Sequence, residues 1–297
     1  MTRSGFVGLA GRPNVGKSTL ANAIVGSKVA IVSDRPQTTR RAVRGIATDP
    51  AGEWQMILVD LPGVQRPRDT LTARMQRRVE RELVEADAAL MVVDGVQGVG
   101  PGDRFISKAL LAASEDTPVA CAVNKCDRLG PAETAAALAA AAELEAVDEV
   151  FPVSAKTGAG LRPMTDHLLS LLPDGPLLYP PEDRYDLPSE VHLAELIREQ
   201  VLRRTREEVP HAVEVAVESV EPREDGLIQV RAQVWVETES QKGIVVGKGG
   251  RMVREIGTAA RKELERDLGA RVFLDLQVRV RRRWRRNESL LDRIGID

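Results

Sequence analysis

Cysteine and aromatic residues are scarce in this sequence, and it contains no long uncharged stretch. Its two cysteines, Cys121 and Cys126, are too few for the disulfide framework of a small secreted domain. The three histidines are scattered, so they form no zinc-ligand spacing with the cysteines. No segment reaches the roughly 18 uncharged apolar residues of a membrane-spanning helix. These absences argue against a secreted disulfide scaffold and an integral membrane protein, and they predict a cytoplasmic protein.

The charge of the chain is nearly balanced but unevenly distributed. Lysine and arginine number 42 and aspartate and glutamate 44, which argues against a uniformly basic nucleic-acid-binding protein. Between Arg271 and Arg286, however, seven arginines stand against one aspartate. Between Ser240 and Lys262, six lysines or arginines stand against one glutamate. The basic charge is therefore concentrated in the last fifth of the chain.

The length of 297 residues is enough for two domains of roughly 150 residues each. In residues 1–172 short apolar runs alternate with helical patterns, which predicts an α/β domain with a doubly wound, mixed sheet. Residues 173–189 are rich in proline and acidic side chains and are predicted to be a linker. Residues 190–297 follow the order helix, strand, strand, helix, glycine turn, helix, strand, which predicts a second domain of the α+β class.

The patterns also predict the individual elements. In the first domain we expect strands at 6–10, 41–49, 53–60, 88–94, 119–124 and 149–154, and helices from about Lys17 and at 71–83, 104–112, 132–144 and 161–171. In the second domain we expect an amphipathic helix at 191–209, strands at 211–219, 227–237 and 272–280, and a helical segment with a glycine-rich break at 241–269.

A glycine-rich motif follows the first predicted strand. Residues 11–18 read GRPNVGKS and match G-x-x-x-x-G-K-[ST] between a strand and a helix. In such a loop the backbone N–H groups and the helix N-terminus surround a phosphate. Lys17 is expected to reach the β- and γ-phosphates, and Ser18 to bind Mg²⁺. The predicted phosphate-binding residues are Gly11, Asn14, Val15, Gly16, Lys17, Ser18 and Thr19.

Three further motifs stand at the ends of predicted strands. Asp60-Leu61-Pro62-Gly63 places a carboxylate for the Mg²⁺ shell and a glycine N–H for the γ-phosphate. Asn124-Lys125-Cys126-Asp127 ends a later strand, and Ser154-Ala155-Lys156 ends the strand after that. Since ligands bind at the carboxyl ends of the strands in a doubly wound sheet, we expect all four motifs to meet around one nucleotide.

Asp127, at the end of the motif Asn124-Lys125-Cys126-Asp127, indicates which base is bound. The carboxylate of Asp127 can accept from both N1–H and the amino group of guanine, whereas adenine has no N1–H. The backbone N–H of Ala155 is expected to donate to guanine O6, a contact that the amino group of adenine would repel. The sequence therefore predicts GTP and GDP as ligands, with Mg²⁺, rather than ATP.

These motifs resemble those of the translation-factor-related P-loop GTPases. GRPNVGKST, DLPG, NKCD and SAK look like the G1, G3, G4 and G5 elements, and PQTTR at 36–40 looks like the G2 switch of the Era group. The resemblance implies GTP hydrolysis, with Lys17, Thr39, Asp60 and Gly63 as its catalytic residues and Ser18, Thr39 and Asp60 as Mg²⁺ ligands. Thr38 is the alternative to Thr39. DLPG departs from the DTPG usual in this group, which affects local packing only.

The group that positions the attacking water differs from that of the small signalling GTPases. Those proteins have a glutamine immediately after D-x-x-G, where this chain has Val64. Asn14 is similar to the asparagine with which related GTPases hold a K⁺ ion beside the phosphates. We therefore expect slow intrinsic hydrolysis that K⁺ stimulates.

A second glycine motif, Gly247-Lys248-Gly249-Gly250, lies in the basic part of the chain, and its surroundings resemble a type II KH domain. Glycines allow a tight turn to approach a sugar-phosphate backbone. Aromatic residues make up only 3% of the chain, so recognition by base stacking is not expected. A groove lined by aliphatic residues such as Ile244 and Val245 is expected instead. The predicted RNA-binding residues are Ile244, Gly247, Lys248, Gly249, Gly250, Arg251 and Arg254. The basic segment Arg281 to Arg286 either binds further phosphates or anionic lipid, or is a solvated tail.

The order of G domain and KH domain covers nearly all of the chain and is similar to that of the Era group. The resemblance implies a GTPase that binds 16S rRNA near its 3′ end and acts in 16S rRNA processing and small (30S) ribosomal subunit assembly. It also implies a monomer in the cytoplasm, in part peripheral on the inner face of the cell membrane. Two alternatives stay open: an RNA-binding factor that its G domain only anchors, and a GTP-regulated membrane or cell-cycle switch that acts through a protein partner.

Overall fold

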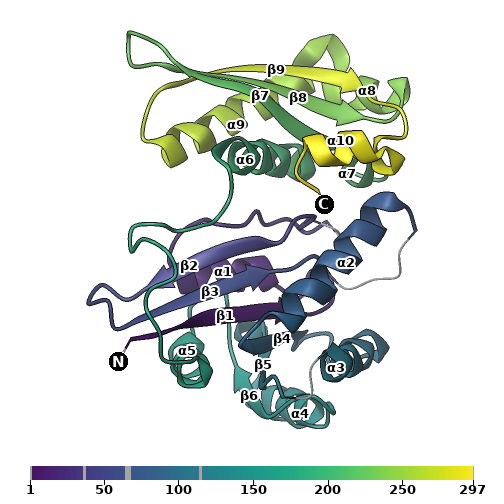
Figure 1. Cartoon of the computed structure of the whole chain (residues 1–297). Coiled ribbons are helices and arrows are strands. Elements are labelled where there is room, and N and C mark those ends of the chain that lie inside the picture. The colour runs from purple at the N-terminus through teal and green to yellow at the C-terminus, as the bar shows by residue number, and fades with distance from the viewer. Residues whose placement is uncertain (1, 36–37, 64–67, 114–115, 297) are drawn as a thin grey trace. The chain divides into compact units, whose positions relative to one another are not determined.

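The computed structural model describes residues 2–35, 38–63, 68–113 and 116–296. The chain divides into two compact units (Figure 1). The first consists of Met1–Ala30, Thr39–Pro67 and Arg74–Asp186, and the second of Ile31–Thr38, Arg68–Ala73 and Leu187–Asp297. Each unit has a hydrophobic core of its own, which agrees with the expectation of two domains.

The first unit is built on a six-stranded sheet. Its strands are β1 (Arg3–Ala10), β2 (Val43–Thr48), β3 (Trp54–Asp60), β4 (Ala88–Asp94), β5 (Val119–Asn124) and β6 (Glu149–Pro152), in the order β2-β3-β1-β4-β5-β6. Only the β2–β3 pair is antiparallel, and the other neighbours are parallel. The predicted doubly wound, mixed sheet is therefore confirmed, with β1 in the interior where the strand order reverses.

Five helices cover the two faces of this sheet. They are α1 (Lys17–Val25), α2 (Thr70–Val84), α3 (Pro101–Ala113), α4 (Pro131–Ala142) and α5 (Leu161–Leu171). One core cluster joins residues of α2, α3 and α4 to the sheet, and α1 and α5 lie on the opposite face (Figure 1). Because both faces are covered, every residue of β4 and β5 is buried, which explains why these strands read as continuous apolar runs.

The proline-rich segment before the second unit is attached to the first unit. The side chain of Gln55 on β3 is fully buried. Its Oε1 accepts from the backbone N–H groups of Leu178 and Tyr179 at 2.8 and 2.9 Å, and its Nε2 donates to the Tyr179 carbonyl at 2.9 Å. Further along, the backbone of Tyr185 bridges that of Gly45 on β2. Residues of the predicted linker therefore run along the β2–β3 side of the sheet instead of hanging free.

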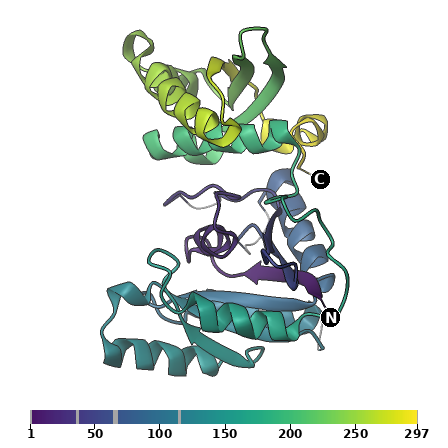
Figure 2. The same cartoon turned by 90° about the vertical axis from the view of Figure 1, so that its left-hand side faces the viewer.

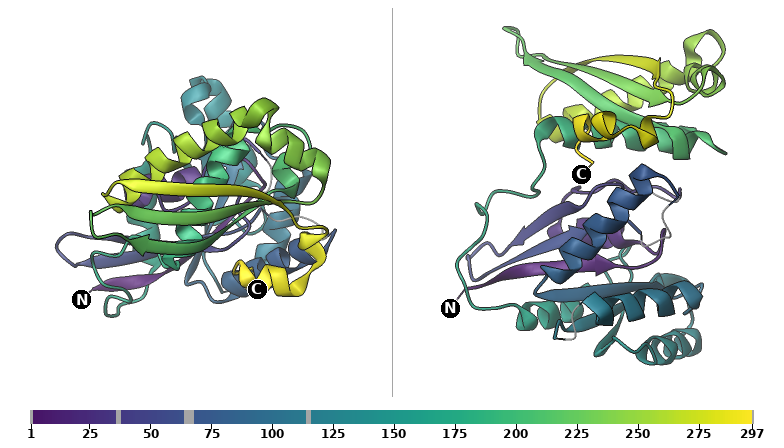
Figure 3. Two further views of the ribbon diagram at one scale, coloured as in Figure 1. Left: turned by 90° about the horizontal axis from the view of Figure 1, so that it is seen from above. Right: turned by 45° about the vertical axis from the view of Figure 1, so that its right-hand side comes forward.

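The second unit contains a three-stranded sheet in the order β7-β8-β9, with β8 antiparallel to β7 and parallel to β9. Its elements are α6 (Ser189–Arg204), α7 (Val209–Ala212), β7 (Glu214–Pro222), β8 (Ile228–Val236), α8 (Glu239–Val246), a 3-10 turn (Lys248–Gly250), α9 (Arg251–Leu268), β9 (Val272–Val280), a second 3-10 turn (Trp284–Arg286) and α10 (Glu288–Arg293). The helices α6 and α9 pack together on one face of the sheet (Figure 2). The predicted order of a type II KH domain is present, and the short α7 and α10 are additions to it. Helix α10 is the yellow helix beside the C-terminus in Figure 3.

Helix α6 is shorter and more deeply buried than its pattern predicts. It ends at Arg204, five residues before the expected end at Val209, and every residue from His192 to Leu202 is buried. Its polar residues are buried because they bind one another. The fully buried guanidinium of Arg198 lies 2.6 Å from Glu195 on the same helix and 3.6 Å from Glu214 on β7. The helix is therefore an interior element and not an amphipathic surface helix.

The arginine-rich segment near the C-terminus is built into the second unit. Trp284 is fully buried, and its indole N–H donates to the Ala212 carbonyl at 2.8 Å. Arg285 pairs with Glu237 at 2.7 Å. A solvated tail is therefore wrong as a description of this segment. None of the helices in the described part of the chain has the length and hydropathy needed to cross a bilayer.

Candidate nucleotide site and nucleic-acid interface

The P-loop connects β1 to the N-terminus of α1, as predicted. Gly16 has φ 105°, and a Cβ atom at this position would lie 2.3 Å from the Asn124 side chain, so only glycine fits. Opposite, a Cβ atom on Gly63 would lie 2.9 Å from Cγ of Pro13. The P-loop is thus in direct contact with both the G3 and the G4 motifs. These three segments are far apart in the sequence.

Lys17 lies folded across the loop. Its ammonium group donates to the carbonyl oxygens of Gly11 and Arg12 at 3.0 and 3.1 Å. Burial lowers the pKa of Lys17 to about 8, and the nearby carboxylate of Asp60 opposes this effect. A buried ammonium that donates to two neutral carbonyls favours an anion as a further partner, as expected for a phosphate-binding lysine.

Three oxygen-bearing side chains meet beside the P-loop. The Ser18 hydroxyl donates to Asp60 Oδ2 at 2.6 Å, and the Thr39 hydroxyl lies 3.1 Å from Ser18 Oγ and 3.3 Å from Asp60 Oδ2. Thr38 instead donates to the Arg35 carbonyl at 2.6 Å. Of the two threonines that the sequence left open, Thr39 is the one that lies with Ser18 and Asp60.

This oxygen cluster fits a magnesium ion. Asp60 is fully buried, and its Oδ1 has no hydrogen-bond partner among the residues that the structure describes. Burial raises the pKa of Asp60, against the effect of Lys17. Two hydroxyls and a carboxylate are hard oxygen ligands of the kind that Mg²⁺ prefers. In proteins Mg²⁺ is usually bound by one or two protein groups together with the phosphates of the substrate. A divalent cation would satisfy the unpartnered oxygen of Asp60.

The G4 motif joins the base side of the site to the phosphate side. The Asn124 amide donates to the Val15 carbonyl at 2.8 Å. The ammonium of Lys125 donates to the Asn14 carbonyl at 2.9 Å and to Asp94 Oδ2 at 2.7 Å. Asp94 ends β4 and is buried, and the sequence analysis did not single it out. The signal was available, because strand 88–94 ends in aspartate as strand 53–60 does.

The predicted base-reading residues lie together at the ends of β5 and β6. Asp127 Oδ1 accepts from the Ser154 hydroxyl at 2.7 Å, which orients the carboxylate. The backbone N–H of Ala155, assigned from the sequence to guanine O6, donates here to Asn124 Oδ1 at 3.0 Å. Lys156 is exposed beside them. The four motifs therefore converge at one edge of the sheet, although the partner of the Ala155 N–H is a protein group in this structure.

Some of the remaining predicted residues of this site lie among the described residues, and others do not. Val15 is buried in the P-loop and Thr19 lies within the first turn of α1. Asn14 is exposed and has a positive φ of 65°. Val64 and two residues of the G2 segment, Pro36 and Gln37, lie outside the described residues.

A second ion pair supports the P-loop, and the sequence analysis missed it. Arg12 pairs with Asp103 at 2.9 Å and donates to the Gly98 carbonyl at 3.2 Å. Asp103 is fully buried at the start of α3, where it also accepts from the backbone N–H of Gly100 at 2.8 Å. Sequence spacing could not show this pair, because its partners are separated by 91 positions.

In the second unit, the G-x-x-G loop joins α8 to α9 as predicted. Gly247 has φ 71°, and a Cβ atom there would lie 2.7 Å from Cβ of Met252, so the turn needs glycine at this position. Lys248 and Gly249 are exposed. The guanidinium of Arg254 donates to the carbonyl oxygens of Gly249 and Gly250 at 2.7 and 3.2 Å, which holds the loop at the start of α9.

The other predicted RNA-binding residues differ in their exposure. Ile244 is 42% exposed, whereas Val245 is fully buried in the core of the second unit. The expectation that both line a groove is therefore wrong for Val245, because these neighbours point to opposite sides of α8. Arg251 is exposed and pairs with Glu255 at 2.8 Å, one helical turn away.

The comparisons with known proteins agree with this geometry. A family model described as a 50S ribosome-binding GTPase matches residues 6–125, and a KH domain model matches residues 208–285. The GTPase Era of Mycobacterium sp. (strain KMS) is 47% identical over 296 residues, which cover 99% of this chain and 98% of the relative. The GTPase Era of Mycobacterium tuberculosis (strain ATCC 25177 / H37Ra) is 46% identical over 296 residues, with 98% of both chains covered.

This chain belongs to the Era family of GTPases. Two solved structures extend the likeness to three dimensions. A crystal structure of an Aquifex aeolicus Era variant bound to GDP and AlF₄⁻ superposes with a TM-score of 0.94 at 35% identity and 99% coverage of both chains. An Era structure in complex with MgGDPNP and nucleotides 1506–1542 of 16S ribosomal RNA gives a TM-score of 0.94 at 35% identity, covering 100% of this chain and 99% of the other.

As a member of the Era family, the protein is a GTPase, and the reaction that it catalyses is the hydrolysis of GTP. The residues predicted from the sequence for the phosphates, the magnesium ion and the base lie within one unit of the chain.

Proposed function

We propose that this chain couples GTP hydrolysis to the binding of 16S rRNA near its 3′ end during assembly of the small ribosomal subunit. In this proposal residues 1–172 bind and hydrolyse GTP, residues 173–189 link the domains, and residues 190–297 bind RNA. The observation that carries it is the presence in one chain of four converging motifs of the nucleotide-binding type and an exposed, basic G-x-x-G loop. The Era structure that holds both MgGDPNP and a 16S rRNA fragment supports the pairing of these ligands.

The roles of the nucleotide-site residues follow from their positions. The P-loop N–H groups and Lys17 bind the β- and γ-phosphates, and Ser18, Thr39 and Asp60 hold Mg²⁺. When bound, Mg²⁺ neutralises the charge that develops on the phosphate oxygens. Asn124 and Lys125 fix the base-binding loop to the P-loop. Asp127, oriented by Ser154, accepts from the guanine ring.

The switch consists of the two residues that meet the γ-phosphate. With GTP bound, Thr39 and the backbone N–H of Gly63 contact this phosphate, and its loss releases both. The change in these loops alters the affinity of the second domain for RNA. RNA affinities that are equal with GDP and with a nonhydrolysable GTP analogue would contradict this coupling.

Potassium is the proposed activator of hydrolysis. Asn14 lies in the P-loop with a positive φ of 65°, and its carbonyl is held by Lys125. A K⁺ ion next to Asn14 would supply positive charge beside the β- and γ-phosphates, where other GTPases use an arginine. We expect the rate of hydrolysis to be higher in K⁺ than in Na⁺ buffer, and the difference to vanish in Asn14→Ala. Equal rates in both buffers would contradict the proposal.

The principal test measures RNA binding and turnover in the same preparations. A fluorescent RNA with the 3′-terminal sequence of 16S rRNA is titrated with the wild type, with Lys248→Asp/Gly249→Asp and with Lys17→Ala, each with GDP and with a GTP analogue. We expect the loop variant to lose RNA binding and keep GTPase activity, and Lys17→Ala to lose the nucleotide dependence. Full biological activity of Lys17→Ala would instead favour a G domain that only anchors the protein.

The same proposal places the protein in the cytoplasm as a monomer, next to its ribosomal substrate. Peripheral association with an anionic membrane would rest on the exposed arginines of the segment Arg281–Arg286. Within that segment Trp284 and Arg285 have internal partners, which reduces the basic surface that the segment offers to an anionic membrane.

A further inference from the structure

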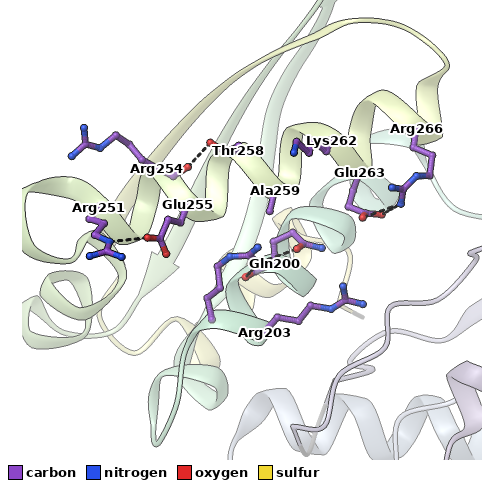
Figure 4. A pocket seen from close by; sticks show the side chains of 11 residues that line it. Gln200, Arg203, Arg251, Arg254, Glu255, Thr258, Ala259, Lys262, Glu263 and Arg266 are labelled. Atoms are coloured by element: carbon purple, nitrogen blue, oxygen red, sulfur yellow. Dashed lines mark hydrogen bonds and ion pairs between the residues drawn. The ribbon is translucent and has the colours of Figure 1, made fainter.

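A basic groove runs between α6 and α9 and extends beyond the residues that the G-x-x-G motif predicts, of which it includes Arg251 and Arg254 (Figure 4). It has a volume of about 700 Å³ and is lined entirely by residues of the second unit. Six of its residues are basic, namely Arg203, Arg204, Arg251, Arg254, Lys262 and Arg266. Its acidic residues are Glu255 and Glu263, so that positive charges exceed negative ones by four.

Among the described residues, three of the six basic side chains have carboxylate partners, and the charge of the other three stays available. Arg203 pairs with Glu199 at 3.1 Å. Glu255 pairs with Arg251 at 2.8 Å, and Glu263 pairs with Arg266 at 3.0 Å, both within α9 and both at exposed arginines. Exposed pairs of this kind contribute little and are easily exchanged for another anion. Within the described part of the chain, Lys262 has no carboxylate at ion-pair distance. The groove therefore has the electrostatic character of a site for a polyanion.

The groove begins at the G-x-x-G loop and extends along one side of α9. Its residues on this helix recur at spacings of three and four, from Arg251 to Arg266, so they form one stripe about 22 Å long. Arg254 belongs to both features, because it lines the groove and donates to the Gly249 carbonyl at 2.7 Å. A chain held at the loop can therefore continue directly into the groove.

We infer that this groove binds the sugar-phosphate backbone of RNA beyond the nucleotides held at the G-x-x-G loop, without reading their sequence. The inference rests on the proposed RNA-binding function and extends its surface. None of the described residues that line the groove is aromatic, so these residues provide no platform for base stacking. Arginine and lysine contacts to phosphates contribute affinity and register but carry no sequence information. A concave site also suits a strand better than a flat lipid surface.

The test compares short and long RNA. A KH loop clamps about four nucleotides, so one RNA has about five nucleotides and the other about twenty, with the same core sequence. The groove variant is Lys262→Gln/Arg266→Gln, which removes two exposed charges. The matched control, Arg261→Gln/Arg271→Gln, removes two exposed charges outside the groove. Circular dichroism and GTPase rate check that both variants fold.

We expect the groove variant to bind the long RNA about tenfold more weakly at physiological salt, with the slope of log K against log salt reduced by about 1.4. Binding of the short RNA should not change, and the control variant should match the wild type with both. Scrambling the outer nucleotides should leave the affinity of the wild type unchanged. Long-RNA binding by the groove variant equal to that of the wild type would overturn the inference, as would an equal loss with both RNAs.

Two further measurements separate this inference from the function on which it rests. If the wild type binds neither RNA, or if Lys248→Asp/Gly249→Asp binds both normally, the proposed RNA-binding function itself fails. Vesicles of phosphatidylglycerol and phosphatidylcholine provide the lipid comparison. A groove variant that loses vesicle binding and keeps long-RNA binding would assign the groove to the membrane and overturn our inference.

Discussion

The replacement Asp127→Asn should change which base the protein prefers. The structure places Asp127 in the middle of the 3-10 turn Cys126–Arg128, with its Oδ1 held by the Ser154 hydroxyl at 2.7 Å. The carboxylate is therefore oriented before nucleotide binds and has acceptor capacity left for the N1–H and amino group of guanine. An asparagine in its place offers one acceptor and one donor, which suits xanthine, whose 2-position bears an oxygen.

The expected size of the effect comes from the two hydrogen bonds to a charged acceptor. Each contributes about 1.5 to 3 kcal/mol. Asparagine loses the bond to the amino group and keeps a neutral acceptor for N1–H, so the loss of guanine affinity is about 2 to 4 kcal/mol, or about thirty- to a thousandfold in Kd. Ser154→Ala is the matched control, because it removes the orienting hydroxyl and leaves the charge. We expect it to weaken GDP binding by about 1 kcal/mol with no change of base preference.

Isothermal titration of GDP and XDP into the three proteins, with Mg²⁺ present, measures both effects. Asp127→Asn should bind XDP more tightly than GDP, and Ser154→Ala should still prefer GDP. An Asp127→Asn protein that keeps the wild-type preference would refute the assignment of this carboxylate to the base. Equal preferences in wild type for guanine and adenine nucleotides would refute the base-binding geometry altogether.

Three other outcomes follow from the structure. Gly247→Ala should lower the free energy of unfolding of the second unit by about 1 to 3 kcal/mol in urea unfolding, because a Cβ atom at this positive φ of 71° would collide with Met252. In the control Gly249→Ala the added Cβ atom meets open space, so the expected loss is only about 1 kcal/mol. Trp284→Phe should cost about 1 to 3 kcal/mol in the same assay, because it leaves the Ala212 carbonyl buried without its donor; an unchanged midpoint would show that the segment is solvated. Burial lowers the pKa of Lys17 to about 8 in the folded protein, so above this pH the unfolded chain holds more protons than the folded one. The free energy of unfolding of the nucleotide-free protein should therefore rise by about 1 kcal/mol from pH 8 to 9 relative to that of Lys17→Met. Parallel curves of unfolding free energy against pH for the two proteins would contradict this expectation.

The elements that could be predicted from the sequence are those with a strong local pattern. The continuous apolar runs at 88–94 and 119–124 predict buried strands, and the glycine motifs predict the turns that follow β1 and α8. The nucleotide motifs all stand at strand ends, so their convergence follows from the topology of a doubly wound sheet. The family-based choice of Thr39 over Thr38 also agrees with the observed cluster around Asp60.

The features that could not be predicted depend on partners distant in the sequence. Arg198 lies in a helix whose polar residues suggest a surface, but Glu195 and Glu214 satisfy its charge inside the unit. The linker looks unstructured because its ordering depends on Gln55, more than 120 positions away. Trp284 likewise looks like part of a charged tail, and only its contact with Ala212 shows that it is buried. In each case a tertiary contact outweighs local composition.

The ion pair between Lys125 and Asp94 has a consequence for the evolution of this enzyme. The Lys125 ammonium group donates both to the Asp94 carboxylate at the end of β4 and to the Asn14 carbonyl in the P-loop. Loss of Asp94 alone would leave the partly exposed Lys125 ammonium without its counter-charge, although the carboxylate is not assigned to any ligand. Natural variants should therefore replace the two residues together or retain both, and a survey of homologues would find them inherited as a pair.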